Sequence, residues 1–132
     1  MQACAQRAES LGNGGFYAPL KAVRAVLDGS GKPLERYQLK IDRAADPSAV
    51  AQLTTSMLQV VDRGTARGAR RWLPASLAIA GKTGTSDDLR DSWFAGFTND
   101  HVVVVWVGAD DNSPTGLSGA SGALPIWARL VA

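Results

Sequence analysis

The chain has 132 residues, of which 45% are hydrophobic and 20% are charged. This length and composition are typical of one packed globular domain, and they exclude disordered, collagen-like and coiled-coil chains. Fourteen basic and twelve acidic residues leave a net charge of +2, a weak field that does not favour nucleic acid as a partner.

The apolar runs of the chain are too short for a membrane span. The most apolar run, Val102 to Val107, is far below the roughly 20 residues that a spanning helix needs. Residues 1–12 carry several polar side chains where an export signal would be apolar. We therefore expect neither a signal sequence nor membrane contact in this segment. The single cysteine, Cys4, cannot form an internal disulfide.

Residues 13–40 are predicted to form a β-hairpin. Apolar and polar residues alternate between Leu20 and Val26 and again over 34–39. The segment 28–33 between them is rich in aspartate, glycine, serine and proline, which favour a turn.

A helix is predicted over residues 47–62. Asp46 is suited to cap its first amides, and Pro47 at the first helical position loses no hydrogen bond that a helix would make there. Gly64 marks its end. A single apolar stripe runs along the helix and consists of Val50, Leu53, Met57, Val60 and Val61.

Four arginines follow this helix closely, at positions 63, 67, 70 and 71. Cations at the C-terminal end of a helix complement its dipole, which is the simpler explanation for the cluster. A patch that binds an anionic ligand is the alternative, and the sequence leaves both open.

The segment 77–109 is predicted to form a three-stranded antiparallel sheet, with strands over 77–85, 92–98 and 101–109. Asn99-Asp100 provides a tight connection between the second and third strands. Residues 119–131 begin with small residues, continue with apolar ones and are predicted to form a closing helix. The predicted fold class is α+β, an antiparallel sheet with flanking helices.

The segment 80–86, with the sequence AGKTGTS, is the part of the chain that indicates chemistry. One interpretation is a phosphate-binding loop, whose pattern ends in Gly-Lys-Thr. That pattern requires a glycine at position 76, where the chain has Ser76, and a helix afterwards, where it has a polar turn. The other interpretation is a Lys-Thr-Gly strand that faces a cleft, as in serine enzymes that act on penicillins and peptidoglycan.

This second interpretation has a physical basis. Such a site must hold the carboxylate of a peptide while a serine attacks the neighbouring carbonyl, so it needs a cation, hydroxyl donors and accessible backbone. Lys82 supplies the positive charge, Thr83 and Thr85 supply hydroxyls, and Gly84 lacks a side chain that would keep the backbone from the substrate.

Six blocks of the sequence, which follow the same order along the chain as in the family, resemble class A penicillin-binding proteins of the penicillin-binding protein 1b type. The resemblance covers about residues 13–131, whereas residues 1–12 form an unmatched N-terminal segment. Three of the blocks resemble the C-terminal half of a transpeptidase domain in general: AGKTGTS at 80–86, DSWFAGFT at 91–98 and VVWVG at 104–108. The other three resemble the class A type more narrowly: GGFYAPL at 14–20, VDRGTA at 61–66 and GASGALPIW at 119–127.

The resemblance implies a role for each residue of the Lys-Thr-Gly segment. Lys82 is similar to the catalytic lysine that sets the electrostatics around the nucleophile and attracts the substrate carboxylate. Thr83 and Thr85 resemble the hydroxyls that bind this carboxylate, and the amide of Thr85 resembles a donor of the oxyanion hole. Gly84 resembles the glycine that keeps the strand edge open.

Several other residues that can bind ligands are expected to have only structural roles. The aromatic side chains of Trp93, Phe94, Trp106 and Trp127 are expected to pack in the fold. His101 is expected to be a solvated turn residue. Three aspartates could suggest a metal site, but a solvated loop is the stronger interpretation for them: Asp87, Asp88 and Asp91.

The sequence departs from the family pattern in two motifs. No serine is followed by lysine three residues later, so the Ser-x-x-Lys motif of the nucleophile is missing. No serine is followed by asparagine two residues later, so the Ser-x-Asn motif is missing as well. In the family both motifs lie upstream of the matched segment.

The resemblance implies that residues 13–132 are the C-terminal portion of a D,D-transpeptidase domain. The parent protein would cross-link peptidoglycan stem peptides by serine acyl transfer at the periplasmic face of the bacterial inner membrane, and it would bind β-lactams. The expected partners are D-Ala-D-Ala peptides, β-lactam antibiotics and the upstream part of the same protein. No cofactor is expected, and the fragment alone is expected to be inactive.

Two alternatives remain open at this stage. In the first, the chain is a non-catalytic module that binds peptidoglycan or another protein through the same strand edge. In the second, it is a fragment of a β-lactamase or D,D-carboxypeptidase.

Overall fold

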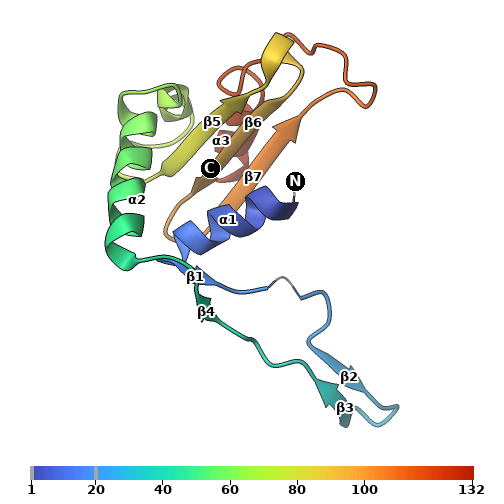
Figure 1. Cartoon of the computed structure of the whole chain (residues 1–132). Coiled ribbons are helices and arrows are strands. Elements are labelled where there is room, and N and C mark those ends of the chain that lie inside the picture. The colour runs from blue at the N-terminus through green and yellow to red at the C-terminus, as the bar shows by residue number, and fades with distance from the viewer. Residues whose placement is uncertain (1, 20) are drawn as a thin grey trace.

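The computed structural model describes residues 2–19 and 21–132 and confirms an α+β architecture (Figure 1). A three-stranded antiparallel sheet has the order β5-β6-β7, and two short strand pairs, β1 with β4 and β2 with β3, lie outside it. Within the described residues the α-helices are α1 (Gln2–Gly12), α2 (Pro47–Asp62) and α3 (Ala123–Leu130), and the short 3-10 helices are η1 (Arg67–Arg71) and η2 (Asp87–Leu89). The strands are β1 (Phe16–Tyr17), β2 (Ala25–Leu27), β3 (Pro33–Arg36), β4 (Asp42–Arg43), β5 (Ala80–Thr85), β6 (Ser92–Phe97) and β7 (Val102–Val107).

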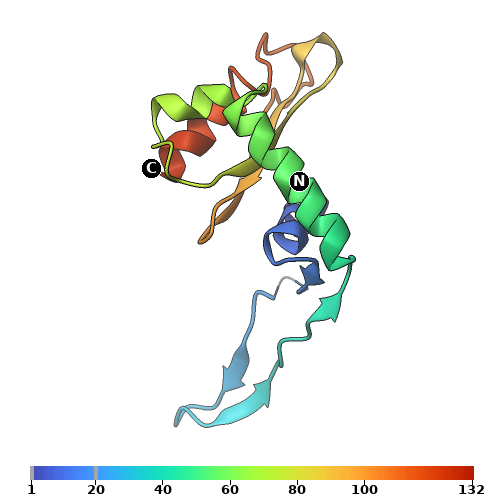
Figure 2. The ribbon, with the colours of Figure 1, turned by 90° about the vertical axis from the view of Figure 1, so that its left-hand side faces the viewer.

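The structure contains the predicted hairpin as the antiparallel pair β2 and β3, but β1, also within the predicted range 13–40, pairs with β4 outside that range. Its turn is held by the carboxylate of Asp28, which accepts hydrogen bonds from the Ser30 hydroxyl and from the amides of Ser30 and Lys32. The hydroxyl bond from Ser30 and the two amide bonds lower the pKa of Asp28. Figures 1 and 2 both show this hairpin extending away from the sheet as an arm.

The apolar residues of the arm do not form a buried face. Leu34 is 69% exposed and Leu39 is 63% exposed. Leu20, which belongs to the alternating pattern, lies outside the described residues. The alternation therefore indicates strand structure in this segment, but it does not indicate burial within this chain.

Helix α2 has the predicted bounds, and Asp46 caps it as predicted. The Asp46 carboxylate accepts hydrogen bonds from the amides of Ser48 at 2.9 Å and Ala49 at 3.1 Å. Val50, Met57 and Val61 of the predicted stripe are buried, and Val60 packs partly buried against the same core. Leu53 of the same stripe is 45% exposed.

The two faces of the sheet have different coverings. Because strand residues alternate between faces, the register places Phe94 of β6 and Thr83 of β5 on one face and Lys82 on the other. Helix α3 covers the first face, where the rings of Trp127 and Phe94 meet edge to face at 5.0 Å. Helix α1 packs against β6 and β7 on the second face, near Phe97.

The buried core joins α3, η1 and the end of α2 to this first face. Trp127, Phe94 and Ile79 are fully buried at its centre, together with Val61. This core fixes the position of β5, because Ile79 immediately precedes that strand. The remaining buried members are Ala66, Ala69, Leu73, Ala123, Leu124 and Ala128.

Two predicted elements begin later in the structure than the sequence indicates. Strand β5 begins at Ala80 instead of Leu77, because the Leu77 amide closes a turn onto the carbonyl of Pro74. The closing helix begins at Ala123 instead of Gly119, because residues 118–122 form a turn over the sheet. Helix α1 was not predicted.

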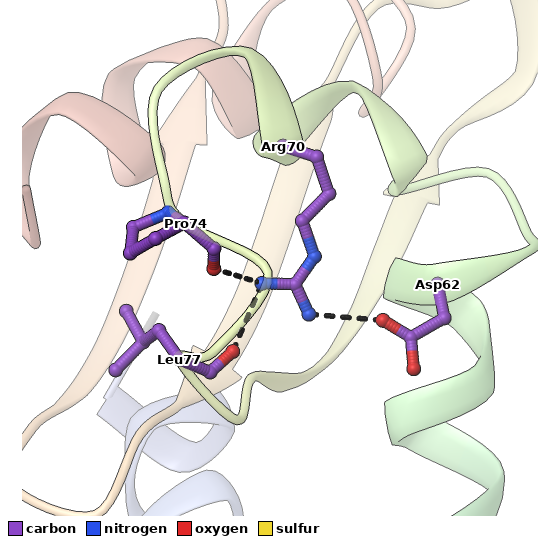
Figure 3. A network of polar contacts seen from close by, with 4 residues as sticks. All are labelled: Asp62, Arg70, Pro74 and Leu77. Carbon is purple, nitrogen blue, oxygen red and sulfur yellow. Dashed lines mark hydrogen bonds and ion pairs between the residues drawn. The ribbon is translucent and has the colours of Figure 1, made fainter.

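The loop that leads into β5 is held by Arg70 (Figure 3). One guanidinium nitrogen of Arg70 donates to the carbonyls of Pro74 at 2.7 Å and Leu77 at 2.9 Å. The other donates to the carboxylate of Asp62 at 2.9 Å. Arg70 thus connects the end of α2 to the start of the strand that carries Lys82.

Substitution Arg70→Met is expected to lower the free energy of unfolding by about 2 kcal/mol, because it removes charge-assisted hydrogen bonds from a mostly buried guanidinium. Arg63→Met is the matched control, since this exposed arginine makes no side-chain contact of this kind in the described part of the chain, and its effect should be within about 0.5 kcal/mol. Urea denaturation of both variants checks this. Equal losses would contradict the structural role of Arg70.

Candidate active-site wall

The Lys-Thr-Gly segment lies in β5, which is the edge strand of the sheet. All six residues of β5 pair with β6, and Lys82 lies opposite Ala95 and Gly84 opposite Trp93. A regular strand cannot curl around a phosphate group, so this geometry excludes the phosphate-loop interpretation. The other edge of β5 has no strand partner in residues 2–19 and 21–132.

Lys82 is exposed and carries its charge along the strand. Its ammonium donates a hydrogen bond to the carbonyl oxygen of Thr83 at 2.7 Å. The positive charge therefore lies beside the backbone of the Lys-Thr-Gly segment, although the side chain leaves the strand from the face opposite to Thr83.

Thr83 is buried and hydrogen-bonded to a residue that the sequence did not indicate. Its Oγ1 lies 2.7 Å from the Oγ1 of Thr65, in the turn that follows α2. Whichever hydroxyl donates to the other, one proton of the pair remains to be donated elsewhere. The pair can thus present one hydroxyl donor to an acceptor such as a carboxylate.

Thr85 is held by the turn that precedes α3. Its Oγ1 accepts a hydrogen bond from the amide of Gly119 at 2.9 Å, which leaves its own proton available for donation. Gly119 packs so closely that a Cβ there would lie 2.6 Å from the carbonyl oxygens of Gly84 and Trp93. Only glycine allows this approach of the turn to the strand.

The same turn is also held by hydrogen bonds to a buried serine. Ser92, at the start of β6, donates to the carbonyl of Ser118 at 2.8 Å and accepts from the amide of Ala123 at 2.9 Å. Ser92 lies opposite Thr85 in the sheet. The end of β5 at Thr85 is therefore held in place by β6, by the turn and by the start of α3.

Gly84 has a packing role in addition to the expected role of leaving the strand backbone accessible. A Cβ at Gly84 would lie 3.1 Å from the Cβ of Trp93, which is a tight contact. The missing side chain therefore makes room for the tryptophan across the strand pair.

The aromatic residues singled out in the sequence pack in the fold as expected, whereas Asp91 is half-buried and is not a solvated loop residue. Trp93 and Trp106 pack at 6.1 Å between ring centroids, and the Trp106 indole donates to Asp91 at 2.8 Å. His101 is exposed at the β6–β7 turn. Asp88 is exposed and pairs with Arg90 at 3.3 Å.

The arrangement provides one exposed cation and hydroxyl donors on a strand edge, which is suited to binding a carboxylate. No helix among the described residues is long and apolar enough to cross a membrane.

Thr65→Val is expected to lower the free energy of unfolding by about 1–2 kcal/mol, because the buried Thr83 hydroxyl loses its partner. Thr65→Ser keeps the hydroxyl and should cost clearly less. Urea denaturation of the two variants measures the difference. Equal destabilisation by valine and serine would contradict a role for this hydrogen bond.

A family model and similar relatives identify the same protein family. The family model described as the penicillin binding protein transpeptidase domain matches residues 2–131, and thus includes most of the first dozen residues, which the sequence left outside the resemblance. Penicillin-binding protein 1B of Vibrio cholerae is 45% identical over 127 residues, which are 96% of this chain and 16% of that protein. Penicillin-binding protein 1B of Escherichia coli is 44% identical over 129 residues, which are 97% of this chain and 15% of that protein. The chain spans about one-sixth of the length of these relatives.

Solved structures share the fold. The crystal structure of penicillin-binding protein 1A from Haemophilus influenzae matches with a TM-score of 0.85 at 22% identity, over 96% of this chain and 25% of that chain. Penicillin-binding protein A from Mycobacterium tuberculosis, solved as a penicillin G acyl-enzyme complex, matches with a TM-score of 0.67 at 25% identity, over 96% of this chain and 31% of that chain.

Proposed function

Because the chain belongs to the penicillin-binding protein transpeptidase family, we propose that it is the C-terminal portion of the D,D-transpeptidase domain of a class A synthase. The longer protein that contains this segment is called the full-length synthase below. It cross-links peptidoglycan stem peptides at the periplasmic face of the bacterial inner membrane.

In this proposal β5 forms one wall of the active site. The hydroxyls of Thr83 and Thr85 donate to the carboxylate of a D-Ala-D-Ala peptide or of a β-lactam, and Lys82 attracts that carboxylate and stabilises charge near the nucleophile. The Thr85 amide donates to the oxyanion that forms when the upstream serine attacks the adjacent carbonyl. The serine then carries the acyl group until an amine of a neighbouring strand takes it.

One observation supports the carboxylate-binding role most directly. Both threonine hydroxyls have a partner that fixes them, Thr65 for Thr83 and the Gly119 amide for Thr85, and each arrangement leaves a proton to donate. Donors fixed before the substrate arrives need little reorganisation when it binds. The family relative solved as a penicillin G acyl-enzyme complex supports the capture of β-lactams by the same fold.

The proposal is tested by comparing a penicillin with its methyl ester, which lacks the negative charge. The full-length synthase is expected to be acylated at least about tenfold faster by the free acid, because charge-assisted hydrogen bonds to the carboxylate are lost in the ester. The double substitution Thr83→Val and Thr85→Val should remove this preference, and the rates follow from mass spectrometry of the adduct.

Thr55→Val is the matched control, since the Thr55 hydroxyl donates only within the exposed face of α2. This control should keep the preference for the free acid. A double variant that still prefers the acid as strongly as the unsubstituted protein would refute the assignment of the two hydroxyls.

A further inference from the structure

The arginine cluster after α2 separates into two groups with different surroundings. Arg70 is engaged by Asp62 and by two carbonyls, so it has a structural role. Arg67 and Arg71, at the two ends of η1, are exposed and form no ion pair or side-chain hydrogen bond with any residue that the structure describes. Both face an open hollow of about 440 Å³ between η1 and the turn before α3, here called the η1 hollow, whose lining includes Thr65, Arg67, Arg71, Trp72, Ser121 and Leu124.

The surroundings of the η1 hollow make it electropositive. Asp62, the acidic residue closest in sequence, already pairs with Arg70. The opposite wall comes from residues 120–125, and residues 113–132 contain no aspartate or glutamate. Arg129 adds a further positive charge, since its guanidinium carbon lies 5.6 Å from the ring centroid of Trp72. An anion that entered the hollow would meet cations and hydroxyls without a competing carboxylate.

The hollow adjoins the Lys-Thr-Gly strand through a single residue. Thr65 lines the hollow, and its Oγ1 is also the hydrogen-bond partner of Thr83. A ligand whose terminal carboxylate is bound at Thr83 can therefore extend past Thr65 towards Arg67. The indole of Trp72, which is half-buried, adds apolar surface suited to the methylene groups of such a ligand.

We infer that the η1 hollow binds a second carboxylate, carried by the same peptide whose terminal carboxylate is held by Thr83 and Thr85. This inference rests on the proposed function and names an acidic peptide as the preferred substrate class. The guanidinium groups of Arg67 and Arg71 donate to the second carboxylate, which arginine can bind through two parallel hydrogen bonds. Selectivity for acidic peptides is thus expected to depend on these two residues.

The test uses the full-length synthase and two peptides that differ only in charge, acetyl-Glu-D-Ala-D-Ala and acetyl-Gln-D-Ala-D-Ala. Each peptide competes with a fluorescent penicillin, and the competition gives its inhibition constant. The Glu peptide is expected to bind about tenfold more tightly than the Gln peptide, and the preference should weaken as salt is raised. The double substitution Arg67→Ala and Arg71→Ala should bring the ratio close to one.

Arg63→Ala is the matched control, because Arg63 belongs to the same cluster but does not line the hollow. It should keep the tenfold ratio, and circular dichroism checks that each variant is folded. A ratio near one in the unsubstituted protein, or a tenfold ratio that survives in the double variant, would overturn the inference. A ratio near one together with competition by inorganic phosphate would make the hollow a general anion site and would also overturn it.

This design separates the two levels of the proposal. If the fluorescent penicillin does not label the unsubstituted full-length synthase, the proposed function has failed. If it labels the synthase normally while the two peptides bind equally, only the second carboxylate site has failed.

Discussion

Incubating the isolated 132-residue chain with a fluorescent penicillin is expected to give no covalent adduct, whereas the full-length synthase is expected to be labelled completely. Covalent capture requires an activated hydroxyl that attacks the β-lactam carbonyl. No serine of the chain has lysine three residues later. Two serines near the Lys-Thr-Gly segment have other roles, since Ser86 accepts from the Asp91 amide and Ser92 is buried beneath the turn before α3.

The readout is in-gel fluorescence after denaturation, which retains only covalent label. A boiled sample of the full-length synthase is the negative control. A stable, stoichiometric adduct on the isolated chain would contradict the account, because it would mean that the chain contains its own nucleophile.

A titration of the isolated chain with acetyl-D-Ala-D-Ala separates the enzyme fragment from a binding module. A module that works on its own should bind the peptide without any upstream sequence. No saturable binding is expected below millimolar peptide, because in the proposed function this chain supplies only one wall of the site.

Lys82→Ala in the full-length synthase is expected to slow acylation by penicillin by about 2–4 kcal/mol in activation free energy, which is roughly 30- to 1000-fold. The substitution removes the positive charge that lies beside the Thr83 carbonyl, at 2.7 Å in the structure. Both the attraction of the substrate carboxylate and the stabilisation of charge near the nucleophile should be lost.

Stopped-flow measurement of the acylation rate constant checks this effect. Lys32→Ala is the matched control, because Lys32 is exposed at the turn of the hairpin arm, and its rate should be unchanged. Lys82→Arg tests geometry separately from charge, since a guanidinium cannot take the place of a compact ammonium without moving. An unchanged rate for Lys82→Ala would remove Lys82 from the mechanism.

Local patterns account for the elements that were predicted correctly. Helix α2 carries its own start signal at Asp46-Pro47, and the carboxylate makes the two capping bonds that the sequence indicates. The sheet is also local, because β5, β6 and β7 follow one another in the chain and pair in that order. Short connections between neighbouring strands make antiparallel pairing predictable.

The errors arise where tertiary contacts decide the result. Helix α1 has no acidic residue in its first turn to indicate a helix start, and it packs by contacts with β6 and β7 that are distant in sequence. Leu53 follows the helical period of α2 but is 45% exposed. The late start of the closing helix depends on the bond between Gly119 and Thr85, which are 34 positions apart.

The sequence proposes the residues of the candidate site, but it does not indicate the contacts that hold them in place. Lys82, Thr83 and Thr85 are candidates because the segment 80–86 resembles the Lys-Thr-Gly segment of the family. The hydrogen bond between Thr65 and Thr83 joins residues 18 positions apart, and nothing in the spacing indicates it. The sequence did contain a weak signal, because Thr65 lies in the block at 61–66 that resembles the family.

We propose that residues 80–86 form the carboxylate-binding wall of a site completed by another part of the polypeptide. A crystal structure of the full-length synthase acylated by penicillin G tests it most directly. The account predicts that the penicillin carboxylate lies within hydrogen-bond distance of the Thr83 and Thr85 hydroxyls, with the acyl oxygen at the Thr85 amide. A penicillin carboxylate bound elsewhere, with β5 remote from the acyl group, would contradict it.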